Sequence, residues 1–195
     1  MEAKKIDKDL EWLRQVSKEV DLATEDISED LKVLEEYCLG HGVFAMAAVQ
    51  LGIPKRLVYI KNTDLDKIED EEWNEATVLV NPVIKRREGL TTFWEACASC
   101  LNNMGMLLRP YKVTISYMDL DGNKLSKVFE GFGSTVFCHE YDHLDGILHM
   151  DKSLEMFDME PEDRAKFRED HPYEILEKTG DYKKLVEEYG KRNKN

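Results

Sequence analysis

Hydrophobic side chains recur at helical spacing in the first forty residues of the chain. In "DKDLEWLRQVSKEV" four apolar side chains fall near one face of a helix, namely Leu10, Leu13, Val16 and Val20. "SEDLKVLEEYCLG" repeats the pattern, with Ser28 as the expected N-cap and Gly40 as the expected end of the helix. The first forty residues are therefore predicted to be mainly helical.

The next part of the chain has the composition of strands. Residues 56–60 and 77–82 are short β-rich runs that end in polar residues or in Asn-Pro. An acidic stretch at 64–75 separates them and is predicted to be a loop.

Alternating apolar residues predict a β-hairpin further along. Residues 113–117 alternate, an Asp-Gly pair follows at 121–122, and a second strand is expected at 124–130. After the hairpin, Ser134 is the expected cap of a helix that Gly146 ends.

The order of these elements predicts an α+β fold. Helices come first, then strands, a hairpin and a further helix, which favours antiparallel strands packed around a central helix over alternating βαβ units. We expect residues 1–195 to form a single catalytic domain, with a surface-helical extension from about residue 153 and its helices from Pro161 on.

Composition and charge narrow the class of protein. With 42% hydrophobic and 34% charged residues and no apolar run near the ~20 residues of a membrane span, the chain is expected to be soluble. Its N-terminus lacks a secretory signal, so we expect a cytoplasmic protein whose four cysteines are thiols, ligands or core residues. A net charge of −13 argues against a nucleic-acid footprint on the main body, although the last six residues, "GKRNKN", are basic.

The sequence "HEYDH" at 139–143 is an HExxH motif. On a helix His139 and His143 share a face and are able to bind one metal ion, while Glu140 lies close enough to contact a water on that ion. This pattern is typical of metal-activated hydrolysis. The competing interpretation is a partly buried helix whose histidines pair with carboxylates.

A catalytic metal needs a third protein ligand, and the sequence offers two. His149 completes the three-histidine spacing of the metzincin proteases, whereas Cys97 in "WEACASC" offers a thiolate. The absence of a secretory signal favours Cys97. Cys97 and Cys100 also form a C-x-x-C, which alternatively indicates a redox pair or half of a structural zinc site.

Three motifs in order resemble those of the peptide deformylases. Their G-x-G-L-A-A-x-Q, E-G-C-L-S and H-E-x-D-H correspond here to "VFAMAAVQ" (43–50), "EACAS" (95–99) and "HEYDH" (139–143). Flanking segments such as "LVNPVI" and "HLDGILHMD" are similar too, and the resemblance extends over roughly residues 10–152.

The resemblance implies a role for each motif residue. It makes Cys97, His139 and His143 the ligands of one divalent metal ion, Fe²⁺ first, with Zn²⁺ or Ni²⁺ also compatible. It implies that Glu140 is the general acid and base, and that the Gln50 side chain and the backbone N–H of Ala98 bind the oxyanion. The implied reaction is removal of the formyl group from an N-formylmethionyl peptide, with release of formate.

The chain departs from the family pattern around the substrate groove. Val43 and Ala45 replace both glycines of the first motif, and Met46 replaces its leucine. We expect Ala45 and Met46 to contact the substrate in a groove whose shape these larger side chains change. The other replacements are Ala96, Ala98 and Cys138.

The sequence is also compatible with two other functions and with one partner. A metzincin-like protease would use His149, and a deformylase-shaped protein without catalysis would serve as a binding module. The basic C-terminus is compatible with a ribosome contact. Asp142 is left outside the catalytic set, and Arg109 is expected to make a structural ion pair.

Overall fold

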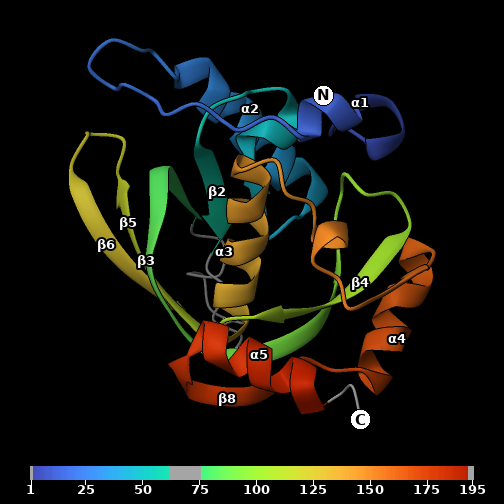
Figure 1. Cartoon of the computed structure of the whole chain (residues 1–195). Helices are drawn as coiled ribbons and strands as arrows, with labels where there is room; N and C mark the ends of the chain where they lie inside the picture. The colour runs from blue at the N-terminus through green and yellow to red at the C-terminus, as the bar shows by residue number, and fades with distance from the viewer. Residues whose placement is uncertain (1, 62–75, 193–195) are drawn as a thin grey trace.

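The computed structural model describes residues 2–61 and 76–192 (Figure 1). The predicted acidic loop at 64–75 lies outside the described residues. The α-helices are α1 (Ile6–Leu13), α2 (Ser28–His41), α3 (Gly131–Leu144), α4 (Arg164–Asp170) and α5 (Tyr182–Arg192). The 3-10 turns are η1 (Ala48–Leu51), η4 (His149–Asp151) and η5 (Pro161–Asp163). The strands are β1 (Ala45–Ala47), β2 (Leu57–Lys61), β3 (Ala76–Ala96), β4 (Asn103–Arg109), β5 (Lys112–Met118), β6 (Lys124–Glu130), β7 (Glu155–Asp158) and β8 (Glu174–Asp181).

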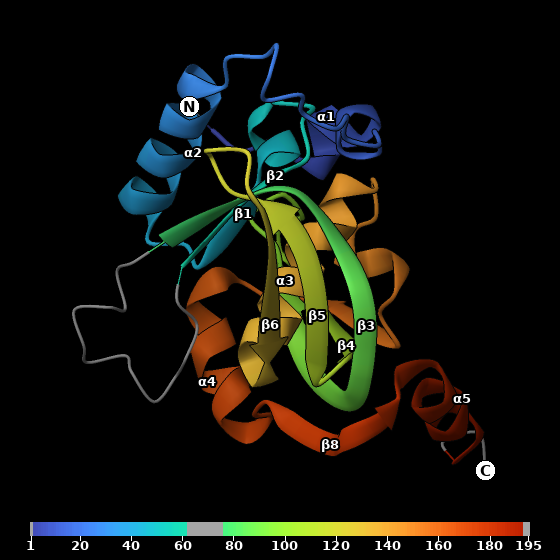
Figure 2. The same cartoon turned by 90° about the vertical axis from the view of Figure 1, so that its left-hand side faces the viewer.

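One long strand, β3, organises the sheet. It has 21 residues and pairs in turn with β2, β5, β8 and β4, always antiparallel. β1 extends the sheet beyond β2, β7 beyond β4, and β6 beyond β5. β3 changes partners along its length. It extends from the N-terminal helices to the end of the molecule that carries β8 (Figure 2).

The helix α3 lies at the centre of the molecule, between the β5–β6 hairpin and β4 (Figure 1). Phe137 and Leu144 on this helix are fully buried in a core with side chains of β2, β3 and β5. The predicted α+β fold, with antiparallel strands around the HExxH helix, is therefore confirmed.

The first predicted helix is too long. The structure ends α1 at Leu13, and both Leu10 and Val16 are exposed. From Ser17 on the backbone bonds to other segments instead of to its own helix: Ser17 N–H donates to Leu144 O, and Val20 N–H donates to Asn81 Oδ1. These tertiary hydrogen bonds explain why the apolar spacing does not continue as a helix.

Three predicted helix ends are also shifted. Ser28 is the first residue of α2, and its hydroxyl donates to Asp26 instead of capping the helix. The helix passes Gly40 and ends at His41, and Gly42 follows as its C-cap with a φ of 62°. Ser134 lies inside α3, where its hydroxyl donates to Pro110 O.

The hairpin and the end of α3 match the prediction. β5 and β6 pair throughout, from Lys112 with Glu130 to Met118 with Lys124. Gly146 follows α3 with a φ of 69°, and its N–H donates to His143 O. This geometry is a Schellman ending, which favours glycine.

The C-terminal part is less helical than predicted. α4 and α5 are present, but β7 pairs with β4, and β8 pairs with β3 from Thr92 back to Glu88. The segment from 153 on therefore adds two strands to the sheet, and Figure 2 shows α4, β8 and α5 along one end of the molecule. The sequence reasoning missed these strands, and it ended β3 at 82 instead of at Ala96.

Candidate active site

Two histidines from α3 and a cysteine from the end of β3 meet at the predicted metal site. The ligand atoms of Cys97, His139 and His143 all lie within 4.8 Å of one another. Cys97 Sγ lies 3.3 Å from His143 Nε2, and Cys97 and His143 are buried. Because His139 and His143 are four residues apart on one helix, a thiol that faces them completes a compact group of three donors.

The other two candidates for the metal site do not join this group. His149 is buried and its ring lies 5.9 Å from that of His139, but it is outside the group of three donors found among the described residues. Cys100 is a free thiol packed in an apolar cluster with Leu13 and Leu148. Among the described residues the geometry thus groups Cys97, and not His149, with the two histidines, while Cys100 packs beside Cys97 in the apolar cluster.

A buried chain of charges holds His139 in place. His139 Nδ1 lies 2.8 Å from Glu95 Oε2, and Arg109 donates to both oxygens of Glu95. Arg109 also donates to Asp142, which accepts from Lys152. Burial alone would raise the pKa of Glu95, but the Arg109 guanidinium holds that pKa well below its usual range.

This arrangement gives roles to residues that the sequence reasoning left unassigned or set aside. Arg109 makes the expected ion pair, and through Glu95 it orients His139 so that Nε2 faces the other donors. The signal for Glu95 was available, since a residue two positions before Cys97 on a strand points to the same face as Cys97.

Glu140 lies beside the three donors and is buried. One of its carboxylate oxygens accepts the backbone N–H of Ala47 at 2.7 Å. Burial is the main reason that the pKa of Glu140 is raised to about 7. A carboxyl group with a pKa near neutrality is able both to accept and to donate a proton at physiological pH.

Gln50 and Ala98 approach the donors from two other segments. Gln50 lies on η1, and its Nε2 donates to Cys97 Sγ at 3.4 Å and to Ser99 Oγ at 3.1 Å. The N–H of Ala98 makes no hydrogen bond within the part of the chain that the structure describes. Gln50 thus offers an N–H donor beside the donor cluster and Ala98 lines the same cavity, while their role toward an oxyanion stays a prediction.

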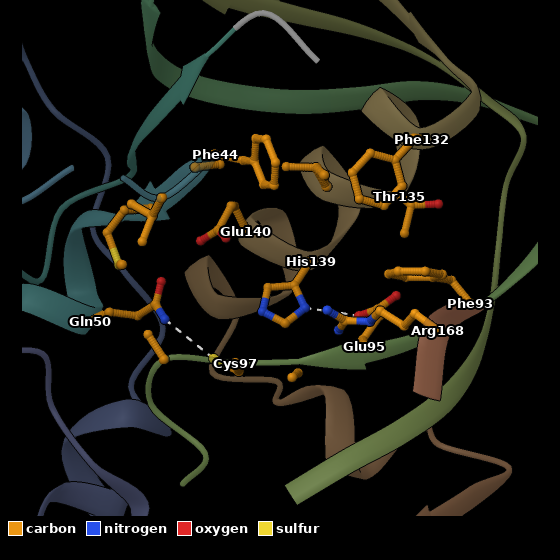
Figure 3. Close-up of a pocket in the computed structure, with 16 residues that line it drawn as sticks. Phe44, Gln50, Phe93, Glu95, Cys97, Phe132, Thr135, His139, Glu140 and Arg168 are labelled. Atoms are coloured by element: carbon orange, nitrogen blue, oxygen red, sulfur yellow. Dashed lines mark hydrogen bonds and ion pairs between the residues drawn. The ribbon is translucent and has the colours of Figure 1, made fainter. Parts of the chain in front are cut away.

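A cavity of about 250 Å³ opens from the donors. Figure 3 shows Gln50 and Cys97 at one side of His139, and Phe44, Phe132 and Phe93 around the other side. The two ends differ in chemistry. One end is polar and reactive, whereas the other combines three phenylalanine rings, which suit an apolar side chain of a substrate, with Thr135 and the Arg168 guanidinium beside them.

The replaced glycines of the first motif do not distort this wall. Val43 and Ala45 line the cavity, and both have negative φ angles, since the described non-glycine residues with positive φ are Asn81 and Leu101. Ala45 and Met46 both line the cavity, and their contact with substrate stays a prediction. Arg168, which the sequence reasoning did not single out, comes from α4 and also lines it.

A buried carboxyl group beside two histidines and a thiol, at the end of a cavity, defines the class of single-metal hydrolase sites.

The family model of polypeptide deformylase matches residues 4–158. The chain is 39% identical over 142 residues to peptide deformylase 2 of Clostridium acetobutylicum, an alignment that covers 72% of this chain and 88% of that protein. It is 33% identical to the peptide deformylase of Finegoldia magna, covering 77% of this chain and 88% of the relative.

Solved structures agree. The Met-Ala-Ser-bound class I type b peptide deformylase of Acinetobacter baumannii superposes with a TM-score of 0.67 at 25% identity, covering 78% of this chain and 97% of that one. The actinonin complex of the Synechococcus elongatus enzyme gives 0.68 at 25% identity, covering 88% and 87%. The chain belongs to the peptide deformylase family of hydrolases.

Proposed function

We propose that this deformylase removes the formyl group from the N-terminal formylmethionine of newly synthesised peptides and releases formate. The observation that carries the proposal is the convergence of Cys97, His139 and His143 beside the buried carboxyl group of Glu140. Two deformylase relatives bind Met-Ala-Ser and actinonin in their solved structures, which supports a peptide as the ligand of this cavity.

The three donors fit one divalent metal ion. Ligand atoms at about 2.0–2.3 Å from a tetrahedral ion lie about 3.3–3.7 Å apart, and the distance of 3.3 Å between Cys97 Sγ and His143 Nε2 agrees. Two nitrogens and a thiolate suit Fe²⁺, Zn²⁺ or Ni²⁺. We propose Fe²⁺ as the native ion, because that is what the family resemblance implies. When bound, the ion would activate water and polarise the formyl oxygen.

Glu140 would move the proton. Its carboxylate faces the cavity beside the donors, and a pKa of about 7 lets it accept a proton from water and then give that proton to the departing amine. The N–H of Ala47 holds one oxygen of the carboxylate and so fixes its direction. The products would be formate and a peptide with a free amino group.

Gln50 and Ala98 would bind the developing oxyanion. The Gln50 side chain is held from its other end, because its Oε1 accepts the N–H of Ala47 at 3.1 Å. A donor that is already oriented needs no reorganisation in the transition state, and one such donor contributes on the order of 10²–10³ in rate. The apolar end of the cavity, with Phe44 and Phe93, would take the methionine side chain.

The setting of the reaction follows from its substrate. Formylated chains leave the ribosome in the cytoplasm, so we propose a cytoplasmic enzyme. A ribosome contact through the basic C-terminus would use Lys191 and Arg192 at the end of α5, while residues 193–195 lie outside the described part. Among the described residues no helix is long and apolar enough to cross a membrane.

Turnover of a formylated peptide tests the proposal. Iron-loaded protein incubated with formyl-Met-Ala-Ser is expected to release formate, and a Glu140→Ala variant with the same iron content is expected to be at least about a hundredfold slower. Equal and negligible formate from both proteins would instead identify a deformylase-shaped binding protein.

A further inference from the structure

The C-terminal segment reaches the cavity although it lies outside the region that the family model matches. That region ends at residue 158, whereas α4 and β8 follow it. Arg168 of α4 lines the cavity together with residues of the three motifs (Figure 3). This arginine also reaches the open edge of β3.

The C-terminal segment occupies one edge of β3 from Glu88 to Trp94. β8 pairs with β3 as far as Thr92, and two residues further on Trp94 O accepts hydrogen bonds from Arg168 Nε at 3.1 Å and Nη2 at 2.9 Å. Because the N–H and C=O groups of a strand alternate in direction with a period of two, Ala96 faces the same way as Trp94. Ala96, which lines the cavity, is thus the next open position on this edge.

A second open edge lies across the cavity, on β1. Phe44 O accepts Lys61 N–H, whereas Ala47 N–H turns the opposite way and donates to Glu140. By the same alternation, Ala45 directs its backbone groups to the cavity side. An extended peptide is therefore able to pair with Ala45 on one side and with Ala96 on the other.

Arg168 places an unpaired charge at the closed end of this groove. It is half-buried, its guanidinium lies 5.0 Å from the ring centre of Phe93, and it forms no ion pair with any residue that the structure describes. Both oxygens of Glu95 are already bonded by Arg109. Nη1 of Arg168 makes no hydrogen bond among the described residues. A half-buried cation without a counter-ion favours an anionic group of a ligand.

We propose that Arg168 binds the terminal carboxylate of short formylated peptides, a substrate class in addition to newly synthesised chains; this inference rests on the proposed function. Trp94 lies three residues before Cys97 on β3, and an extended chain advances about 3.3 Å per residue. A peptide with its formyl group at Cys97 would thus bring its third residue level with Arg168.

The test compares the acid and the C-terminal amide of one peptide. Zinc-loaded protein is titrated with Met-Ala-Ser and with Met-Ala-Ser amide, and formate release is measured with the formylated forms of both. We expect the acid to bind about tenfold more tightly than the amide, since a hydrogen bond to a charged group is lost in the amide. Arg168→Gln should remove this preference, and Arg168→Lys should retain part of it.

Lys166→Gln is the matched control, because Lys166 lies on the same helix, is exposed and also carries one positive charge. It should keep the full preference. Each variant is judged by a ratio within one preparation, so a smaller folded fraction cancels. Equal dissociation constants for acid and amide in the wild type, or an unchanged ratio in Arg168→Gln, would overturn the proposal. Absence of formate with a preserved, Arg168-dependent preference would overturn the proposed function alone.

Discussion

A few residues form the site, and they differ in how well their positions could be predicted from the sequence. Cys97, His139 and His143 stand in short motifs, and the spacing of the histidines on a helix is enough to bring them together. Glu95 could be predicted from its position two residues before Cys97, near the end of β3. Arg168 was not, because it reaches the cavity only through the docking of α4 on β3, which no local pattern encodes.

The identity of the third ligand gives a prediction at this scale. Cys97→Ser should weaken zinc binding by at least about a hundredfold, since a thiolate ligand is lost, whereas His149→Ala should leave it within about threefold. Competition with a chromophoric chelator measures both affinities. A loss of zinc affinity in His149→Ala that Cys97→Ser does not share would restore the three-histidine site.

The Glu95–Arg109 pair gives a second prediction, on stability. Both side chains are only 4% exposed, so Glu95→Gln leaves Arg109 with one buried partner fewer and should cost about 3 kcal/mol in the metal-free protein at neutral pH. Glu88→Gln is the control, because its partner Arg86 is exposed, and it should cost less than about 1 kcal/mol.

The same pair predicts a pH dependence. The pKa of Glu95 is lowered in the folded state from an ordinary value near 4.5, so its stabilising effect is complete above that value and is lost as the pH falls toward the folded pKa. The difference in unfolding free energy between wild type and Glu95→Gln should therefore shrink between pH 7 and about pH 3.5. Urea unfolding at several pH values measures it, and parallel curves would contradict the assignment.

At the scale of elements, alternation of apolar and polar residues predicted a strand correctly where the two faces of that strand have different surroundings. It predicted the β5–β6 hairpin, but it missed the continuation of β3 through "KRREGL". In that stretch Lys85, Arg86 and Arg87 are not buried, and tertiary pairing with β5 and β8 holds the backbone extended. Likewise, β8 is a strand because the edge of β3 is available to it.

The end of α3 gives a prediction for an element. A Cβ added to Gly146 would lie 2.3 Å from Arg14 O, and the φ of 69° adds backbone strain. Gly146→Ala should therefore lower the unfolding free energy by about 2 kcal/mol or more. Gly40→Ala has no atom within 4 Å of the new Cβ and lies in α2, so it should be neutral or stabilise by up to about 1 kcal/mol. Chemical denaturation compares the pair, and equal effects would rule out the steric explanation.

At the scale of the whole molecule, the expected single domain stays a prediction. It is supported by β8, which pairs with β3, and by Phe157 and Phe167, whose rings pack on Trp94. We expect the far- and near-ultraviolet circular dichroism of the full chain to change in one coincident thermal transition. Two separated transitions would show that the C-terminal segment unfolds as an independent unit.

The length of β3 has a consequence for how the metal site forms. Its partners come from both earlier and later parts of the chain, and contacts between distant segments form slowly during folding. Cys97 follows the last residue of this strand. Its thiol therefore faces the histidines of α3 only after β3 has paired with β4. During refolding the metal ion would then bind only as fast as β3 pairs with β4. A partly folded molecule would not yet have the three donors close enough together to bind a metal ion.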